Sequence, residues 1–594
     1  MTITASLQDR AHLAAPAGLG EPAASFTAGA HVLRVWGAAP NQVAELDGRV
    51  VVFEGALHDT TALARAAHMA EAACRARPAA AILGAVAANG PAALDDLVGS
   101  FWVAVADVSA GRVVVRPDRW AFRGVRYTAV EGGWAWSASI VPLIAWGGPR
   151  SIERAVLPDA LAYRLVLGNR TIVAGVMNVT PLCEVTLASG AVPRRWDDMP
   201  FAPEPADEPR AVWAARLDQA LDTAMANVRA RHDSVGVLLS GGVDSALLAA
   251  KAQRAGFSRV IAWSADIEGD TGEELRRARE IARHLGIEHR VIRVSDAAIA
   301  AGADDVLRAV EMLPRNHSDF VLAALLEAAA GEGGAVLYGE AADTLLGPSD
   351  GIAIASIERR RRLLTWLPRA VQRGLAGALA LWPSSLAQRM ALLMRYTAAE
   401  RIVRSLRLES AALPWTLLRG MPPDQPLVLD FLPEFDPSVE GLLEWEQRRT
   451  LAGDCRIHWQ AATRLAATLG IGVELPFMDD AVVALARRLP TTYKRDGDWT
   501  KPLLRDVARP LVPERYEVLP KLGFPVPMRR WLEGPLKPWL DAALAPGSHV
   551  SALLDMAAVR ALRWPDDLEL LLTVGSLERY IEVFLARPAA GAAA

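Results

Sequence analysis

The sequence predicts a two-domain protein, with an α+β domain built on antiparallel sheets followed by an α/β domain built on a parallel sheet with helical additions. Its 594 residues are more than one hydrophobic core normally organises. The segment PFAPEPADEP (200–209) has four prolines and no apolar periodicity, which predicts a linker. Strand-like runs dominate before this linker, and strands alternate with helices after it. We therefore expect one domain at 1–205 and a second at 206–590.

The first domain contains four runs of β-branched and aromatic residues that predict strands. They are RVVVFEGAL (49–57), GSFWVAVADV (99–108), RVVVR (112–116) and GGWAWSAS (132–139). Helical patterns at about 60–76 and at 78–88 interrupt these strands. Strands that follow one another, with helices between only some of them, predict antiparallel sheets in an α+β domain.

The second domain is predicted to begin with an amphipathic helix at 211–232. Strands and helices are then expected to alternate, with a helix at 272–286 and strands at 235–239, 259–266, 289–295 and 335–339. This alternation predicts a parallel sheet with right-handed crossovers, and ligands of such sheets bind at the carboxyl ends of the strands. From 350 onward we expect a mainly helical structure.

Composition narrows the function and the compartment. Lys and Arg number 64 against 68 Asp and Glu, a balance that argues against a general nucleic-acid binder. The cysteines Cys74, Cys183 and Cys455 show no CxxC spacing, so neither a disulfide framework nor a cysteine zinc site is indicated. The first residues show no signal-peptide pattern, and the apolar run at 374–382 is too short to cross a membrane. We expect a cytoplasmic protein.

One loop carries the strongest chemical signal in the sequence. It follows the apolar run 235–239 and consists of Ser240, Gly241, Gly242, Val243, Asp244 and Ser245. Where a strand gives way to a helix, backbone N–H groups and the helix dipole favour an anion such as phosphate. The glycines allow close backbone approach, the serines can donate hydrogen bonds, and Asp244 tolerates phosphate only if Mg²⁺ lies between them. Neither GxxxxGKS/T nor GxGxxG fits, and a capped helix start is the alternative.

This loop resembles the pyrophosphate loop (PP-loop) of the ATP pyrophosphatase superfamily, and later motifs resemble its asparagine synthetase branch. The similar segments, in family order, are YGEAADTLLG (338–347), GVELPFMDDAVVALARRLP (472–490), TKPLLRDV (500–507) and LPKLGFPVPMRRWLEGPL (519–536). Five elements in the right order are a specific match. The resemblance implies that ATP activates a carboxylate as an acyl-adenylate, and that an amine then displaces AMP to form an amide.

The first domain resembles the glutaminase half of the same family, an Ntn-hydrolase-like antiparallel sandwich. VVFEGALHD resembles the family's NGEIYN strand, and WAWSASIVPLI resembles its FASExKAL segment. Active glutaminases begin Met-Cys, with the N-terminal cysteine as nucleophile, whereas here position 2 is Thr2 and the asparagine of NGE is replaced near Glu54. The resemblance therefore implies a degenerate glutaminase domain that serves as a scaffold. A Thr2 nucleophile is the alternative.

The resemblance assigns roles to charged residues in the second domain. Asp244 and Asp343 match the carboxylates that hold Mg²⁺, although helix capping is the alternative for Asp343. Lys501 matches a lysine that contacts pyrophosphate, and Lys521 matches one that reaches the reacting centre and stabilises developing negative charge.

The remaining site residues concern the amine and the nucleotide. Glu340 stands where asparagine synthetases carry Glu and β-lactam synthetases carry Tyr, and Asp454 is placed like the acid that partners it. Together they are expected to accept the proton of the amine, with the pKa of one carboxyl raised by the other. The pocket for adenine and ribose is expected to be lined by Leu238, Ser264, Tyr338 and Gly339.

Three amide-forming functions are compatible with these motifs. A scaffold that binds nucleotide without turnover is a fourth possible function. An asparagine-forming or glutamine-dependent amidotransferase lacks its cysteine, although an amidotransferase of this kind that uses ammonia is an alternative, and a β-lactam synthetase would carry Tyr at Glu340. A lasso peptide cyclase fits best, because it joins an Asp or Glu side chain of a precursor core peptide to the N-terminal amine of that peptide. The basic, aromatic region 351–450, with ERRRRLLTWLPRAVQR (358–373) and LEWEQRRT (443–450), suits docking of a peptide or partner protein. A solvated helix face is the alternative there. A leader peptidase and a leader-binding protein are the further expected partners.

Overall fold

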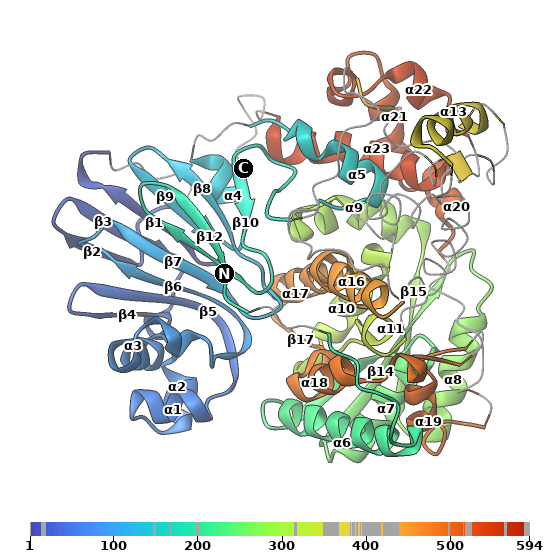
Figure 1. Ribbon diagram of the computed structural model, residues 1–594, viewed down its shortest axis with the longest axis horizontal. Coiled ribbons are helices and arrows are strands. Elements are labelled where there is room, and N and C mark those ends of the chain that lie inside the picture. Colours follow the sequence, from blue (N-terminus) through green and yellow to red (C-terminus); the bar gives the residue numbers. More distant parts are fainter. Residues whose placement is uncertain are drawn as a thin grey trace.

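The computed structural model describes most of the chain, and the account below concerns those residues. They are 2–12, 19–146, 150–166, 168–197, 201–313, 318–347, 367–380, 382, 387, 390–391, 394, 417–419, 439–496, 499–514, 516, 526–563 and 567–586. Two antiparallel sheets form one side of the molecule, and a parallel sheet covered by helices forms the other (Figure 1). The predicted mixture of antiparallel and parallel sheets is confirmed.

The front part of the chain folds as a sandwich of two six-stranded sheets. The first has the order β10-β8-β9-β1-β3-β2 and the second β12-β11-β7-β6-β5-β4. The strands of the first sheet are β1 (Thr4–Asp9), β2 (Ala24–Ala28), β3 (His31–Trp36), β8 (Arg126–Val130), β9 (Gly133–Ser137) and β10 (Val176–Asn178). Those of the second are β4 (Val43–Leu46), β5 (Arg49–Asp59), β6 (Val98–Asp107), β7 (Arg112–Pro117), β11 (Cys183–Leu187) and β12 (Ala191–Arg195).

The second sheet is buried on both faces, which explains the continuous apolar run in β5. Val50 and Val52 face the other sheet, whereas Val51 and Phe53 face a layer of short helices. These helices are α1 (Thr61–Ala67), α2 (Glu71–Ala76) and α3 (Pro78–Asn89). The single helical pattern expected at 60–76 is therefore wrong, because α1 ends at His68, which adopts a left-handed conformation with φ of 53°.

The parallel sheet has the strand order β15-β14-β13-β16-β17. Its strands are β13 (Ser234–Leu238), β14 (Arg259–Ile267), β15 (Glu288–Val294), β16 (Ala335–Leu337) and β17 (Gly472–Glu474). The first four lie within a few residues of the predicted strands, and β17 is an additional edge strand paired with β16. After β13 the chain adds β14 and β15 on one side, and then β16 and β17 on the other. The carboxyl ends of β13 and β16 therefore form the switch point where such sheets bind ligands.

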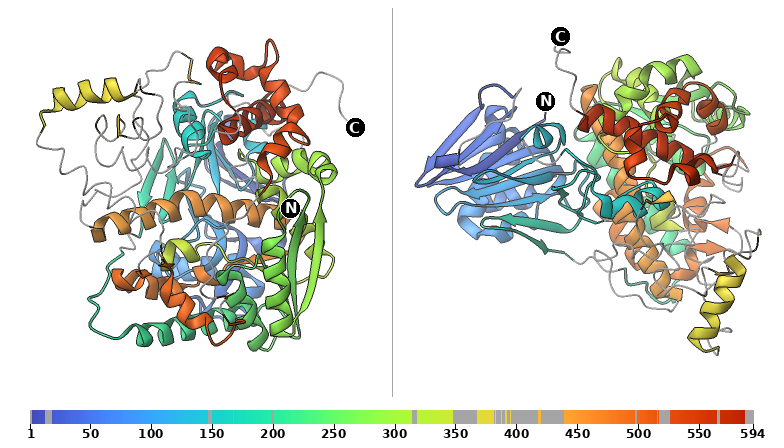
Figure 2. Two further views of the ribbon diagram at one scale, coloured as in Figure 1. Left: turned by 90° about the vertical axis from the view of Figure 1, so that its right-hand side faces the viewer. Right: turned by 90° about the horizontal axis from the view of Figure 1, so that it is seen from above.

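Helices cover both faces of the parallel sheet (Figures 1 and 2). One face packs against α6 (Arg210–Arg229), α7 (Val243–Arg254), α8 (Glu273–Leu285), α18 (Asp480–Arg488) and α19 (Pro502–Ala508). On the other face, α10 (Ser318–Ala330) and α17 (Arg456–Thr468) contact the strands. The same buried cluster continues into α9 (Asp296–Val310), α20 (Met528–Glu533), α21 (Lys537–Leu544) and α23 (Leu568–Tyr580). Other helices are α4 (Val141–Ala145), α5 (Leu157–Tyr163), α11 (Ala342–Leu346), α13 (Arg369–Ala380), α16 (Val439–Thr450) and α22 (Met556–Arg560). Among the described helices, none is both long and apolar enough to cross a membrane.

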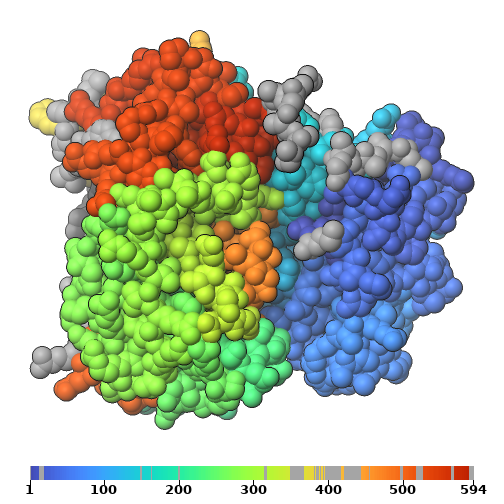
Figure 3. Space-filling model, turned by 180° about the vertical axis from the view of Figure 1, so that it is seen from behind, coloured from blue at the N-terminus to red at the C-terminus, as the bar shows by residue number. Residues whose placement is uncertain are grey.

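The hydrophobic core crosses the predicted domain boundary. Ile140, Val156 and Val173 from the front part share one buried cluster with residues of α9, α10 and α23. The two halves consequently lie in broad contact, as the space-filling view shows (Figure 3). The predicted linker is itself anchored, because Phe201 is buried and the backbone N–H of Ala202 donates to the carbonyl of Arg487.

Part of the basic region is not an exposed docking surface. In α16, Arg449 is 2 % exposed and pairs with the buried Glu446, with Nη2 2.7 Å from Oε1. Arg448 pairs with Glu444 in the same helix. Buried arginines that are paired in this way stabilise the helix rather than face a partner, so the expectation for LEWEQRRT is wrong in this respect. Most of the segment 358–373 lies outside the described residues.

Candidate active site

The glycine loop lies at the carboxyl end of β13 and is held by its own serines. The hydroxyl oxygens of Ser240 and Ser245 are 3.2 Å apart, and the Ser245 hydroxyl donates to the carbonyl of Gly242. The Gly242 N–H donates to the Ser240 hydroxyl, and α7 begins at the next residue. The hydroxyls therefore fix the loop at the N-terminus of a twelve-residue helix, where backbone N–H groups favour an anion.

Three residues predicted for the site converge beside this loop. Asp244 lies in the first turn of α7, Asp343 in the first turn of α11, and Lys501 immediately precedes α19. The Lys501 Nζ lies 2.6 Å from Asp244 Oδ2 and 2.8 Å from Asp343 Oδ1, and its side chain is 3 % exposed. Two carboxylates that follow neighbouring strands thus pair with the same lysine.

The donor set of this cluster fits a divalent metal ion. Carboxylate oxygens are the ligands that Mg²⁺ prefers, and the Lys501 ammonium lies between the two acids where a cation is favoured. Asp244 and Asp343 would hold the ion, which would neutralise the charge of a bound phosphate. Lys501 is close enough to both acids to contact the same phosphate.

Burial and His458 act in opposite directions on the pKa of Glu340. Burial acts to raise the pKa of Glu340, but the charge of His458 and its hydrogen bond to the carboxylate bring the pKa below its ordinary value. The His458 Nδ1 lies 3.3 Å from Glu340 Oε1. Burial and the neighbouring Glu340 raise the pKa of Tyr338 well above its ordinary value. Glu340 is therefore an ionised acceptor whose partner is a histidine on α17.

Two residues of the predicted catalytic set cannot be placed. Lys521 lies outside the described residues. Asp454 belongs to the π-helical turn Leu451–Cys455, directly before α17, and its side chain is likewise outside the described part. Both remain predictions.

Of the residues expected around adenine and ribose, Leu238 ends β13, Tyr338 and Gly339 follow β16, and Ser264 lies inside β14, three residues before its last residue, Ile267. Leu238 is the last residue of β13, and Gly339 follows β16 so closely beside the loop that an added Cβ would be 3.7 Å from the Asp244 Cβ. The Ser264 hydroxyl donates to the carbonyl of Leu239 at 2.6 Å and contacts His289 Nε2 at 2.9 Å. Ser264 therefore supports the base of the loop, because its hydroxyl is engaged and only 4 % of the residue is exposed.

The front domain carries an acid where the similar strand of glutaminases carries asparagine. The Glu54 Oε2 accepts the backbone N–H of Ile3 at 2.8 Å, and burial raises the pKa of this carboxyl. The carboxylate of Asp118, in the RPDR segment, accepts backbone N–H groups from Phe101, Trp120 and Phe122. Both acids are thus engaged in holding the backbone, which is consistent with a scaffold.

Comparisons with known proteins agree with these motifs. The family model described as Asparagine synthase matches residues 216–570, more than half of the chain.

The chain belongs to the asparagine synthase family.

Curated relatives support the same assignment. A putative glutamine-hydrolyzing asparagine synthetase of Mycobacterium tuberculosis is 29% identical over 356 residues, which cover 58% of this chain and 53% of the relative. Glutamine-hydrolyzing asparagine synthetase 1 of Bacillus subtilis is 24% identical over 443 residues, which cover 71% of this chain and 67% of the relative. This chain thus spans about half the length of the mycobacterial relative. A solved glutamine phosphoribosylpyrophosphate amidotransferase from B. subtilis overlaps with a TM-score of 0.21 and 11% identity, over 45% of this chain and 67% of that one.

Sequence reasoning on this asparagine synthase family member missed His458. The residue is in the AGDCRIHW segment, but nothing in a single sequence says which face of α17 meets Glu340. Its position four residues after the predicted Asp454, about one helical turn, was the available signal.

Gly241 offers a direct test of the loop conformation. Its φ is +81°, and an added Cβ would lie 2.6 Å from the carbonyl oxygen of Glu274 and 2.8 Å from the Arg277 Cβ. Gly241→Ala is expected to destabilise the fold by more than the ~1–2 kcal/mol of a left-handed residue, because α8 must also move. Urea unfolding measures this loss. The control is Gly242→Ala, since Gly242 has φ of −81° and its Cβ would meet only the Ser240 hydroxyl at 3.4 Å. Equal stability of the two variants would contradict the assigned strain.

Proposed function

We propose that this asparagine synthase family member is an ATP- and Mg²⁺-dependent amide ligase that acts as a lasso peptide cyclase. It adenylates an Asp or Glu side chain of a precursor core peptide and joins it to the N-terminal amine of that peptide, with release of AMP and pyrophosphate. The observation that carries the ligase proposal is the convergence of Asp244, Asp343 and Lys501 beside an anion-binding helix start.

The charges of the site suit activation of a carboxylate by ATP. Backbone N–H groups of the loop and the Lys501 ammonium neutralise the phosphates, while the metal held by Asp244 and Asp343 supplies further positive charge. The substrate carboxylate attacks the α-phosphorus of ATP, the bond to the β-phosphate oxygen breaks, and pyrophosphate leaves. Lys521 is proposed to stabilise the negative charge that develops in the second step.

The Glu340 and His458 pair suits the second step, in which an amine replaces AMP. An attacking ammonium must lose a proton, and the ionised carboxylate of Glu340 can accept it. His458 lies within hydrogen-bond distance of this carboxylate and holds it in place. The geometry supports this pair in the role that sequence resemblance gave to Glu340 with Asp454.

The choice of a peptide amine rests on the front domain and the motif set. Glu54 and Asp118 are committed to backbone contacts, and Thr2 stands where the resembled glutaminases carry cysteine. We therefore propose that the amine used in the second step does not come from glutamine. A leader peptidase and a leader-binding protein would deliver the peptide as the precursor is processed.

The test is incubation of the protein with ATP, Mg²⁺ and a leaderless precursor peptide encoded beside its gene. We expect a product that is lighter than the linear peptide by one water and is formed together with AMP. Its ring should resist carboxypeptidase. Conversion of aspartate and glutamine to asparagine at a comparable rate would overturn the cyclase proposal. Absence of AMP formation with every carboxylate offered would overturn the ligase proposal itself.

Glu340→Gln should separate the two steps of the reaction. Removing a proton acceptor is expected to slow amide formation by about 10²–10⁴-fold. Exchange of labelled pyrophosphate into ATP, which reports the first step, should remain near the unmodified rate. His458→Asn serves as the companion variant, because loss of the imidazole should raise the pKa of Glu340 and move the acid limb of the pH–rate profile to higher pH. An equal loss of both steps in Glu340→Gln would argue against the assigned role.

A further inference from the structure

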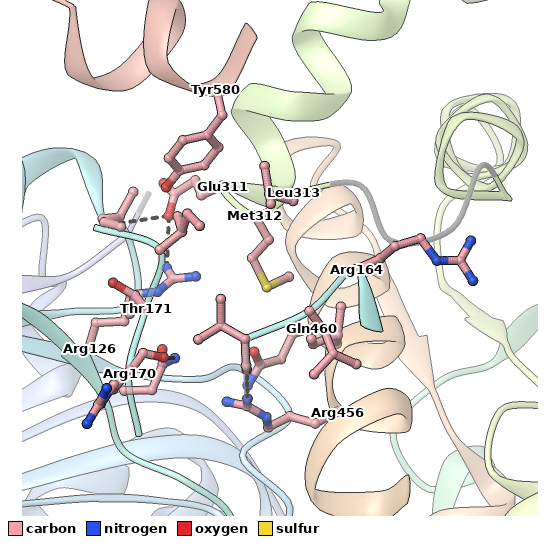
Figure 4. A pocket seen from close by; sticks show the side chains of 16 residues that line it. Arg126, Arg164, Arg170, Thr171, Glu311, Met312, Leu313, Arg456, Gln460 and Tyr580 are labelled. Atoms are coloured by element: carbon pink, nitrogen blue, oxygen red, sulfur yellow. Dashed lines mark hydrogen bonds and ion pairs between the residues drawn. The ribbon is translucent and has the colours of Figure 1, made fainter. Parts of the chain in front are cut away.

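A cavity lies between the two halves of the molecule, and no residue of the glycine loop lines it (Figure 4). Arg126 and Thr171 line it from the front domain, and Met312, Gln460 and Tyr580 line it from the helical side. In Figure 4, Tyr580 points into this space from α23, Met312 reaches toward its middle, and Arg456 enters from α17.

The cavity is surrounded by more buried positive than negative charge. Arg126 Nη1 and Arg464 Nη1 lie 3.0 Å and 2.6 Å from the same oxygen, Glu311 Oε2. A third arginine, Arg456, is 2 % exposed, and its Nη2 donates to the carbonyl of Val166 at 3.4 Å. Among the residues that line the cavity, Glu311 carries the only carboxylate, and its ion pairs are with Arg126 and Arg464.

Arg456 is the group that this arrangement leaves uncompensated. Among the described residues its Nε has no hydrogen-bond partner, and burial lowers the pKa of Arg456 to about 10. Buried charges in proteins are normally paired, since an isolated one loses its hydration without gaining an equivalent interaction. An anion in the cavity would supply the missing charge and accept the two parallel N–H groups of a guanidinium edge.

The other walls indicate what the anion carries. Met312, Leu313 and Ile457 present apolar surface, while the buried Tyr580 hydroxyl has no hydrogen-bond partner in the part of the chain that the structure describes. Inorganic phosphate would meet this apolar wall without benefit, whereas an apolar body would be buried by it. We propose that the cavity binds a small organic carboxylate, with its charge against Arg456 and its apolar part against Met312, Leu313 and Ile457.

This site is separate from the proposed amide-forming centre. Arg456 and His458 are two residues apart on α17, which turns them by about 200° around the helix axis. His458 faces Glu340, whereas Arg456 faces the cavity. Binding can therefore be measured without ATP and without turnover, and its outcome does not depend on the proposed function.

The probe is hexanoate, with hexanamide as a neutral compound of the same shape. Thermal unfolding and isothermal titration calorimetry are carried out on the full chain in chloride-poor buffer. We expect hexanoate to raise Tm saturably and to bind with a measurable heat, and hexanamide to do neither. Equal effects of both compounds, or no effect of hexanoate, would overturn the proposal. Inorganic phosphate binding as tightly and displacing hexanoate would overturn the assignment to an organic carboxylate.

Variants locate the binding. Arg456→Gln should weaken hexanoate binding by about tenfold or more, because the charge-assisted pair is lost. Arg529→Gln is the matched control, since Arg529 is 63 % exposed and pairs with Glu533 on the surface of α20. Met312→Trp should abolish binding by filling the cavity with the charges left intact, which keeps the test valid if Arg456→Gln does not fold. Unchanged affinity in Met312→Trp would place the ligand elsewhere and refute the proposal.

Discussion

Asp244→Asn should lose pyrophosphate exchange and AMP release by about 10³-fold while the fold is retained. The substitution keeps the shape of the side chain but removes the charge that faces Lys501 at 2.6 Å and that would share a metal with Asp343. The rate is measured by release of labelled pyrophosphate at saturating Mg²⁺, and circular dichroism reports folding.

Asp233→Asn is the control for this variant. Asp233 directly precedes the amino end of β13, whereas Asp244 follows the carboxyl end of that strand. Its side chain is 88 % exposed and forms a surface ion pair with Arg229. We expect activity and stability close to the unmodified protein. An Asp244→Asn protein that still exchanges pyrophosphate would refute the metal-holding role, and a nucleotide-binding scaffold would then become the better description.

Glu311→Ala should cause the largest loss of stability, about 3–5 kcal/mol, because two buried arginines would lose their shared carboxylate. Glu311 also accepts the backbone N–H of Ile140 at 2.8 Å, so the variant loosens the contact between the two halves. Guanidinium unfolding measures the loss. Glu533→Ala is the control, since its pair with Arg529 is exposed and is expected to contribute less than about 1 kcal/mol.

The same residue gives a pH dependence with a defined sign. Burial acts to raise the pKa of Glu311, but Arg464 and Arg126 bring it below the ordinary value of 4.5. A lowered acid pKa contributes stability that is present above about pH 4.5 and is lost as the pH falls through the pKa of the folded state. Glu311→Ala should therefore show a shallower loss of stability on acidification. An identical acid profile in both proteins would show that Glu311 does not contribute in this way.

The sequence was most informative where one local rule decides the structure. Alternating helices and strands predicted the parallel sheet, and the motif SGGVDS predicted a loop between a strand and a helix, where Gly241 adopts φ of +81°. Strands such as β1 and β17 were missed, because β1 reads as a polar and apolar mixture and β17 is only three residues long. Both are defined by the strands they pair with rather than by their own residues.

Side-chain partners were beyond the reach of a single sequence. Asp244, Asp343 and Lys501 could be brought together by matching family motifs, since each lies in a motif with a fixed place. The partner of Glu340 could not, because helix rotation decides that His458 faces it. Arg456 was missed for a related reason. An arginine in an apolar helix is normally expected to face solvent until its neighbours are known.

The buried cluster that joins Ile140, Val156 and Val173 to α9, α10 and α23 bears on how this protein could be recombined. A cut at the proline-rich segment would strip a hydrophobic layer from those helices, and a fragment starting there would be prone to aggregate. A chimaera between relatives should therefore transfer residues 138–179 together with the second half. The part that must be transferred as one piece is therefore discontinuous along the chain, although the order of the predicted domains suggests two separable modules.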